Sequence, residues 1–166
     1  MNGVELERKF LVARLPAHLE RDAGGQISQG YLVIGEDGSE VRIRRRGNRT
    51  MLTVKQGSGL VRREEEIRIP EADFDRLWPL TEGRRIEKRR HEIALDGGLV
   101  LELDVYGGEL RGLLIAEVEF PSVEIAEGFS APDWLGPEVT DDDSYKNRRL
   151  ATAGLPPGRL PVGPIP

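Results

Sequence analysis

The fold of this 166-residue chain is decided most clearly by Leu101-Glu102-Leu103-Asp104-Val105-Tyr106-Gly107-Gly108. Apolar and acidic residues alternate from Leu101 to Val105, and two glycines follow. Because successive side chains of a β-strand point to opposite faces, the alternation predicts a strand with one apolar and one charged face. The two glycines predict a tight turn into an antiparallel neighbour.

The same alternation recurs along most of the chain, with glycine-rich turns such as Gly35-Glu36-Asp37-Gly38 and Asp96-Gly97-Gly98 between the segments. This pattern predicts eight strands joined largely by hairpins. The predicted strands span residues 4–12, 27–34, 40–47, 50–56, 61–69, 84–95, 99–106 and 113–120.

Three short helices are expected between and after the strands. One follows Pro70 and ends at Pro79, a second follows Ser122, and a third begins at about Asp143 and ends at Gly154. We therefore expect a mainly β protein, an eight-stranded antiparallel closed β-barrel with the helices outside it.

The chain is expected to form one domain over residues 1–153, followed by a tail at residues 154–166 that is rich in proline and glycine. No apolar run approaches the roughly 20 residues that span a bilayer, and the N-terminus is too acidic for a signal peptide. These features predict a cytoplasmic protein that does not bind membranes.

Composition excludes several kinds of site. The chain has no Cys and two His, which rules out disulfides, a thiolate metal site and a histidine-rich zinc site. Any metal would be held by carboxylates, which suit Mg²⁺, Mn²⁺ or Ca²⁺. The net charge of −5 argues against a wholly basic nucleic-acid binder.

Every predicted strand has a charged face, and for any one strand that face could simply lie in water. Eight such strands in a closing sheet favour a charged interior, where clustered carboxylates suit hard divalent cations and arginines suit phosphate oxygens. The predicted interior holds Glu5, Glu7, Glu64, Glu66, Glu102, Asp104, Glu117 and Glu119 beside Lys9, Arg42, Arg44, Lys55, Lys88 and Arg90.

The segment Glu5-Leu6-Glu7-Arg8-Lys9 resembles the ExExK signature of the CYTH domain, which the triphosphate tunnel metalloenzymes share. The resemblance covers roughly residues 4–153 and is nearest to short bacterial inorganic tripolyphosphatases. It continues in family order through Gln29-Gly30-Tyr31-Leu32, Arg42-Ile43-Arg44, Thr53-Val54-Lys55, Glu64-Glu65-Glu66-Ile67, Glu87-Lys88-Arg89-Arg90, Glu102-Leu103-Asp104, Glu117-Val118-Glu119-Phe120 and Tyr145-Lys146-Asn147.

The resemblance implies a tunnel that binds a linear triphosphate along its axis, with a C-terminal helix at one end and two Mg²⁺ or Mn²⁺ ions. The residues that it implies as metal ligands are Glu5, Glu7, Asp104, Glu117 and Glu119. The phosphate-binding residues that it implies are Lys9, Arg42, Arg44, Lys55, Lys88, Arg90 and Lys146. Catalysis would rest on the five ligands together with Lys9 and Lys55.

Other charged and aromatic residues are expected to have structural roles. Glu64, Glu66 and Glu102 are expected to form ion pairs rather than to bind metal directly. The arginines at 45, 46, 62, 63, 85 and 89 are expected on solvated faces or hairpin ends, and His91 outside the interior.

Three functions remain open at this point. The first is metal-dependent hydrolysis of a triphosphate, most simply inorganic tripolyphosphate but also thiamine or nucleoside triphosphates. The second is a CYTH-type adenylyl cyclase, and the third is a non-catalytic polyphosphate-binding module. Residue patterns leave the physiological triphosphate and the choice between monomer and homodimer open.

Overall fold

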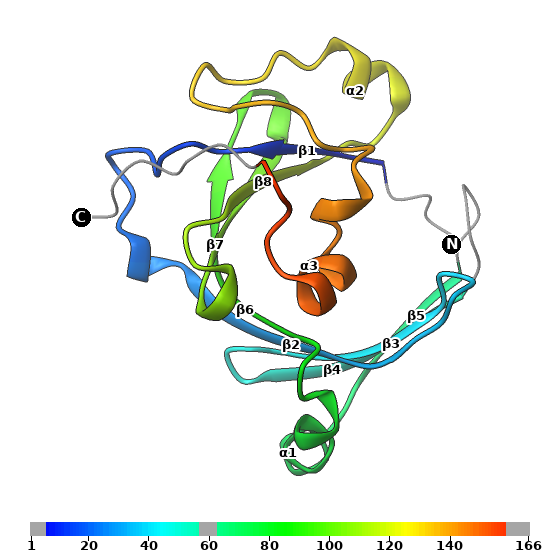
Figure 1. The fold of residues 1–166 in the computed structure, drawn as a ribbon. Helices are drawn as coiled ribbons and strands as arrows, with labels where there is room; N and C mark the ends of the chain where they lie inside the picture. Colours follow the sequence, from blue (N-terminus) through cyan, green and yellow to red (C-terminus); the bar gives the residue numbers. More distant parts are fainter. Residues whose placement is uncertain (1–5, 57–62, 159–166) are drawn as a thin grey trace.

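A computed structural model describes residues 6–56 and 63–158, which form one antiparallel eight-stranded sheet curved around a C-terminal helix (Figure 1). The strand order across the sheet is β1-β8-β7-β6-β2-β3-β4-β5. The strands are β1 (Glu7–Leu11), β2 (Gly25–Ile34), β3 (Glu40–Arg46), β4 (Arg49–Gln56), β5 (Arg63–Arg68), β6 (Arg85–Ala94), β7 (Val100–Tyr106) and β8 (Leu114–Glu119).

The helices are short and take up little of the chain. They are α1 (Glu71–Leu77), α2 (Val123–Gly128) and α3 (Asn147–Ala153). Single 3₁₀ turns occur at η1 (Arg21–Ala23), η2 (Trp78–Thr81), η3 (Asp96–Gly98), η4 (Gly108–Leu110) and η5 (Asp143–Tyr145). Among the described residues, no helix is long and apolar enough to cross a membrane.

The prediction of a closed barrel was wrong, because within residues 6–56 and 63–158 β1 and β5 are the two edges of the sheet and do not pair. A segment at 136–139 occupies the outer edge of β1 instead. Leu11 donates its backbone N–H to the Pro137 carbonyl at 2.9 Å, and Val139 donates to the Lys9 carbonyl at 2.8 Å. The outer backbone groups of Lys9 and Leu11 on β1 are therefore already hydrogen-bonded.

The concave face of the sheet changes from charged to apolar along its strands. Where α3 packs, the inward-facing positions are Leu11, Ile86, Tyr106 and Ile115, and all are buried with Leu150 of α3 in one cluster. Burial of these side chains fixes α3 inside the curve of the sheet. The remainder of the concave face is mainly charged.

The convex face is covered from two sides. A cluster that contains Phe10, Leu103 and Val118 lies under α2 and the segment after it. On the other side, α1 packs on β3 and β4 through the buried Phe74. The apolar side chains under α2 and under α1 therefore lie on the convex side, outside the charged interior, as the alternation in the sequence requires.

All eight predicted strands are present within a few residues of their expected bounds, and the helices after Pro70 and Ser122 are confirmed. The third helix begins later than expected. Extended backbone at Lys146 (φ −70°, ψ 137°) separates the 3₁₀ turn η5 from α3. The turn predicted at 57–59 and the tail from 159 onward lie outside the described residues, so the domain boundary stays a prediction.

Candidate active site

The charged part of the concave face encloses a cavity of about 390 Å³. Each of the eight described strands contributes at least one lining side chain, and β7 contributes Glu102. The start of α3 supplies the rest. The lining residues are Glu7, Lys9, Ile27, Gln29, Tyr31, Glu40, Arg42, Arg44, Arg46, Lys55, Glu64, Glu66, Lys88, Arg90, Glu102, Glu117, Glu119, Lys146, Asn147 and Arg148.

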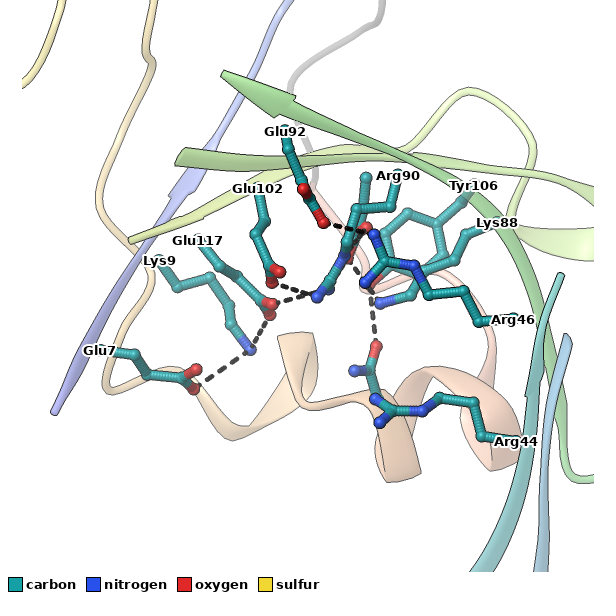
Figure 2. Close-up of polar contacts among 12 residues, drawn as sticks. Glu7, Lys9, Arg44, Arg46, Lys88, Arg90, Glu92, Glu102, Tyr106 and Glu117 are labelled. Carbon is teal, nitrogen blue, oxygen red and sulfur yellow. Dashed lines mark hydrogen bonds and ion pairs between the residues drawn. The ribbon is translucent and has the colours of Figure 1, made fainter. Parts of the chain in front are cut away.

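One wall of the cavity, formed by β1 and β8, is rich in carboxylates. Antiparallel pairing sets Glu7 opposite Glu119 and Lys9 opposite Glu117. The ammonium nitrogen of Lys9 lies 2.9 Å from Glu117 Oε1 and 3.9 Å from Glu7 Oε1 (Figure 2). Burial lowers the pKa of Lys9, but the charges of Glu117 and Glu7 outweigh burial and raise the pKa overall.

Asp104 on β7 lies behind this wall and is fully buried. Its carboxylate accepts from Lys88 Nζ at 2.5 Å and from Nε and Nη2 of Arg90 at 2.7 Å each. Burial lowers the pKa of Lys88, and the charge of Asp104 offsets only part of that effect. The same carboxylate holds the pKa of Arg90 above its ordinary value despite burial.

Arg90 is the centre of the network on this side of the cavity. Its guanidinium also forms ion pairs with Glu102 and with Glu117, the latter at 3.1 Å (Figure 2). Burial raises the pKa of Glu117, but Lys88, Lys9 and Arg90 outweigh burial and lower that pKa to about 2. Glu117 is therefore ionised at neutral pH, although it is buried.

The opposite wall, formed by β3, β4 and β5, carries the other cations. Lys55 Nζ lies 2.7 Å from Glu64 Oε2, and Arg44 Nη2 lies 3.1 Å from Glu66 Oε2. Arg42 Nη2 is 3.8 Å from Glu64, while its buried Nε has no hydrogen-bond partner among the described residues. Burial lowers the pKa of Arg44, and the nearby arginines 42, 90 and 46 lower it further.

The start of α3 closes the cavity from inside the curve of the sheet. Lys146 pairs with Asp143, and Arg148 Nη1 donates to the Gly38 carbonyl in the β2–β3 turn at 3.2 Å. Tyr106 donates its hydroxyl to Asn147 Oδ1 at 2.8 Å. These contacts connect α3 to β7 and to the β2–β3 hairpin.

The structure brings most of the predicted site residues together. Glu5 lies outside the described residues, and Asp104 lies behind the cavity wall with its oxygens in contact with Lys88 and Arg90. The ion pairs expected of Glu64, Glu66 and Glu102 are present. The predicted residues that line the cavity are Glu7, Lys9, Arg42, Arg44, Lys55, Lys88, Arg90, Glu117, Glu119 and Lys146.

Sequence reasoning missed some of the lining residues. Arg46 was expected on a solvated face or at a hairpin end, and it is exposed at the end of β3, but it also lines the cavity and pairs with Glu92 (Figure 2). Arg46 is two residues after Arg44, and residues at this spacing in a strand point to the same face, so the sequence could have predicted it. Gln29 and Tyr31 were not predicted as lining residues because they are uncharged. Asn147 was not predicted because the role of its motif was assigned to the preceding residue, Lys146. His91 lies outside the cavity as expected, buried beside Gly24.

The carboxylates of the cavity suit a hard divalent cation, although no group of three acidic or histidine side chains in residues 6–56 and 63–158 is arranged to hold one. Mg²⁺ needs no such group, because it commonly binds one or two carboxylates together with water and substrate phosphates. Glu7 and Glu119, directly opposite on neighbouring strands, place their Cβ atoms roughly 5 Å apart. The donor set therefore fits magnesium bound together with a phosphate.

Fold and cavity define the class of this protein, an antiparallel eight-stranded sheet around a charged interior. No family model matches the chain. An inorganic triphosphatase of Nitrosomonas europaea is 47% identical over 147 residues, which are 89% of this chain and 96% of that protein. An inorganic triphosphatase of Acetivibrio thermocellus is 38% identical over 150 residues, which are 89% and 93% of the two chains. The chain belongs to the inorganic triphosphatase family.

Solved structures agree with this assignment. A crystal structure of an inorganic triphosphatase superposes with a TM-score of 0.71 at 42% identity, covering 89% of this chain and 94% of that one. A Bacillus halodurans protein proposed to be an adenylate cyclase superposes with a TM-score of 0.56 at 18% identity, covering 77% and 87%. The second likeness shows the fold alone.

Proposed function

We propose that the protein hydrolyses a terminal phosphoanhydride bond of inorganic tripolyphosphate, so that water adds and pyrophosphate and orthophosphate are released. The observation that carries this proposal is a cavity that combines carboxylates on β1 and β8 with arginines and lysines on β3, β4 and β6. The names of the relatives at 47% and 38% identity support it.

The cations of the cavity are suited to grip a polyphosphate. Arg42 and Arg44 on β3 present planar donor forks, which match phosphate oxygens bidentately. Lys55, Lys88 and Lys9 add point charges around the same space. Because negative charge redistributes to the bridging oxygen as the anhydride bond breaks, fixed cations at that position stabilise the transition state.

The carboxylates at Glu7, Glu117 and Glu119 are proposed to hold Mg²⁺ or Mn²⁺, two ions in all, with Glu5 as a further ligand. When bound, a divalent cation would neutralise phosphate charge and acidify a coordinated water. Cavity carboxylates that do not hold the metal can accept hydrogen bonds from that water and orient it towards the terminal phosphorus. The reaction needs no protein nucleophile, which suits a chain with no Cys and two His.

Asp104 is proposed to act differently from the metal ligand that the family resemblance implied. Its carboxylate is fully buried and holds Lys88 and Arg90 in place. Removing it would leave both cations buried without their main partner, which is costly. We therefore propose that Asp104 positions these two phosphate-binding side chains.

The lining of the cavity favours an inorganic triphosphate over a nucleotide. Apart from Ile27 and Tyr31, which are about 1% exposed, every lining side chain is polar or charged. A nucleobase or thiazolium ring would need an accessible aromatic or apolar surface, and the described lining offers none. A cyclase or a nucleoside triphosphatase is therefore the second candidate rather than the first.

The test is product identification. Purified protein is incubated with tripolyphosphate and, separately, with ATP in Mg²⁺, and products are resolved by anion-exchange chromatography. We expect pyrophosphate and orthophosphate from tripolyphosphate, and slower release of phosphate from ATP. Cyclic AMP as the main product from ATP would instead assign a cyclase, and binding without turnover of either compound would assign a binding module.

The finer assignments rest on the sequence. We propose that the family is the CYTH, or triphosphate tunnel metalloenzyme, family on the motifs described above, and that the protein is cytoplasmic. The proposed partner is a small-molecule polyphosphate, with no nucleic-acid or membrane partner.

A further inference from the structure

The side chain of Asn147 is the one neutral amide that α3 brings to the wall of the cavity. In the part of the chain that the structure describes, only residues 146–148 line the cavity from outside the strands. Lys146 and Arg148 are charged and have ion-pair or carbonyl partners of their own. Asn147 lies between them, partly exposed to the cavity.

A fully buried tyrosine fixes the orientation of this amide. The Tyr106 hydroxyl donates to Asn147 Oδ1 at 2.8 Å, and the tyrosine side chain is about 1% exposed. A tyrosine hydroxyl is protonated at neutral pH, so it is a hydrogen-bond donor. A flipped amide would leave this buried O–H without an acceptor, which is unfavourable.

The fixed orientation has a consequence for the other end of the amide. Asn147 Nδ2 carries two N–H donors, and within residues 6–56 and 63–158 no acceptor is in hydrogen-bond contact with it. It is also not among the buried polar atoms without a partner, which indicates that it reaches open space. Donors that face a cavity lined by phosphate-binding cations complement phosphate oxygens.

We infer that Asn147 binds the substrate directly, by donating an N–H of its side-chain amide to a phosphate oxygen, and that Tyr106 is a positioning residue which keeps the amide donor turned to the cavity. This inference rests on the proposed function for the identity of the substrate. It assigns to Asn147 and Tyr106 a role that neither the charge pattern nor the similar proteins indicate.

The test compares Asn147→Ala, Asn147→Asp, Tyr106→Phe and the double variant Tyr106→Phe/Asn147→Ala with the wild type. The matched control is Thr152→Ala, an exposed position of α3 whose hydroxyl donates to the backbone carbonyls of Arg148 and Arg149. The measurements are kcat and KM for tripolyphosphate in Mg²⁺, the dissociation constant of tripolyphosphate by calorimetry in EDTA, and the melting temperature.

We expect Asn147→Ala to raise KM and the dissociation constant about tenfold, as loss of a hydrogen bond to a charged group would. Asn147→Asp keeps an acceptor for Tyr106 but turns a carboxylate oxygen to the polyanion, so its loss should exceed that of the alanine variant while the melting temperature is retained. Tyr106→Phe should raise KM about threefold, and the double variant should equal Asn147→Ala, because the tyrosine acts through the amide.

A dissociation constant of Asn147→Ala within twofold of the wild type would overturn the inference, as would full activity of Asn147→Asp. Additive losses in the double variant would overturn the role of Tyr106. If the wild type does not hydrolyse tripolyphosphate, the proposed function fails, and the binding comparison in EDTA still decides the role of Asn147. A wild type that does not bind tripolyphosphate would overturn both.

Discussion

Asp104 shows how burial decides what an acidic residue can do. Its neighbour two positions away, Glu102, lines the cavity with its side chain partly exposed, whereas Asp104 is fully enclosed and in contact with Lys88 and Arg90. Alternation along β7 predicts that both face inward, but it carries no information on depth. The sequence therefore predicted the face of Asp104 and missed its partners.

Replacing Asp104 with Asn should destabilise the protein in the absence of metal. The change leaves buried cations with a weakened partner, which costs about 3 kcal/mol, or roughly 10 °C in melting temperature for a chain of this size. Asp141→Asn, at an exposed position, should change stability by less than about 0.5 kcal/mol. Melting in EDTA measures both. If Asp104 instead bound metal, the melting temperature in EDTA would be unchanged, and only the rise on adding Mg²⁺ would shrink.

The arginines of β3 allow a test of which side chains face inward. Arg42→Ala and Arg44→Ala should each lower kcat/KM for tripolyphosphate by about tenfold to 100-fold, because a charged hydrogen bond to phosphate contributes to both binding and the transition state. Arg63→Ala on β5 is the control, since Arg63 is exposed and does not line the cavity. Steady-state kinetics of the three variants give the comparison, and equal losses in all three would show that the inward assignment is wrong.

At the scale of elements, the pairing of β1 with β8 places the carboxylate wall. The first and last strands of the chain are neighbours in the sheet, and Glu7 lies opposite Glu119. The sequence predicted that these strands would meet, on the ground that a closed barrel brings its ends together. They meet by direct pairing, while the opening of the sheet falls between β1 and β5. Local alternation cannot identify such partners, because strand order depends on contacts distant in sequence.

A shared ion between β1 and β8 predicts a particular pattern of losses. Glu7→Gln and Glu119→Gln should each lower kcat/KM by about 100-fold, since each removes charge that holds a hard cation. The double variant should be scarcely worse than the worse single variant, because residues that act through one ion are not independent. Kinetics in saturating Mg²⁺ provide the values, with Glu65→Gln on the outward side of β5 as the control.

Melting of the same variants supplies an independent check. Removing one of several clustered carboxylates relieves repulsion, so the melting temperature in EDTA should be unchanged or higher. The rise on adding Mg²⁺ should shrink, because stabilisation by a ligand follows its affinity for the folded state. Strictly additive losses of activity, or an undiminished rise with Mg²⁺, would exclude a shared ion.

For the whole molecule, what alternation could predict was the set of strands and their two faces. The charged and apolar residues of β1, β3, β7 and β8 lie on the faces expected of them. Three features of the structure could not be predicted from the alternation. The edge of β1 is taken by the segment at 136–139, the apolar positions Ile86 and Ile115 interrupt the charged interior, and α3 fills that interruption. Each depends on how a distant segment packs, which a pattern of period two does not encode.

We propose that this cavity hydrolyses tripolyphosphate with the help of a divalent cation held by carboxylates. The most direct test follows tripolyphosphate by phosphorus NMR with wild-type protein freed of metal by EDTA and dialysis, before and after Mg²⁺ is added. We expect no hydrolysis before the addition, then conversion to equal amounts of pyrophosphate and orthophosphate, and no further hydrolysis once EDTA is restored. Full turnover in the verified metal-free sample, or no turnover after Mg²⁺ or Mn²⁺ is added, would contradict the proposal.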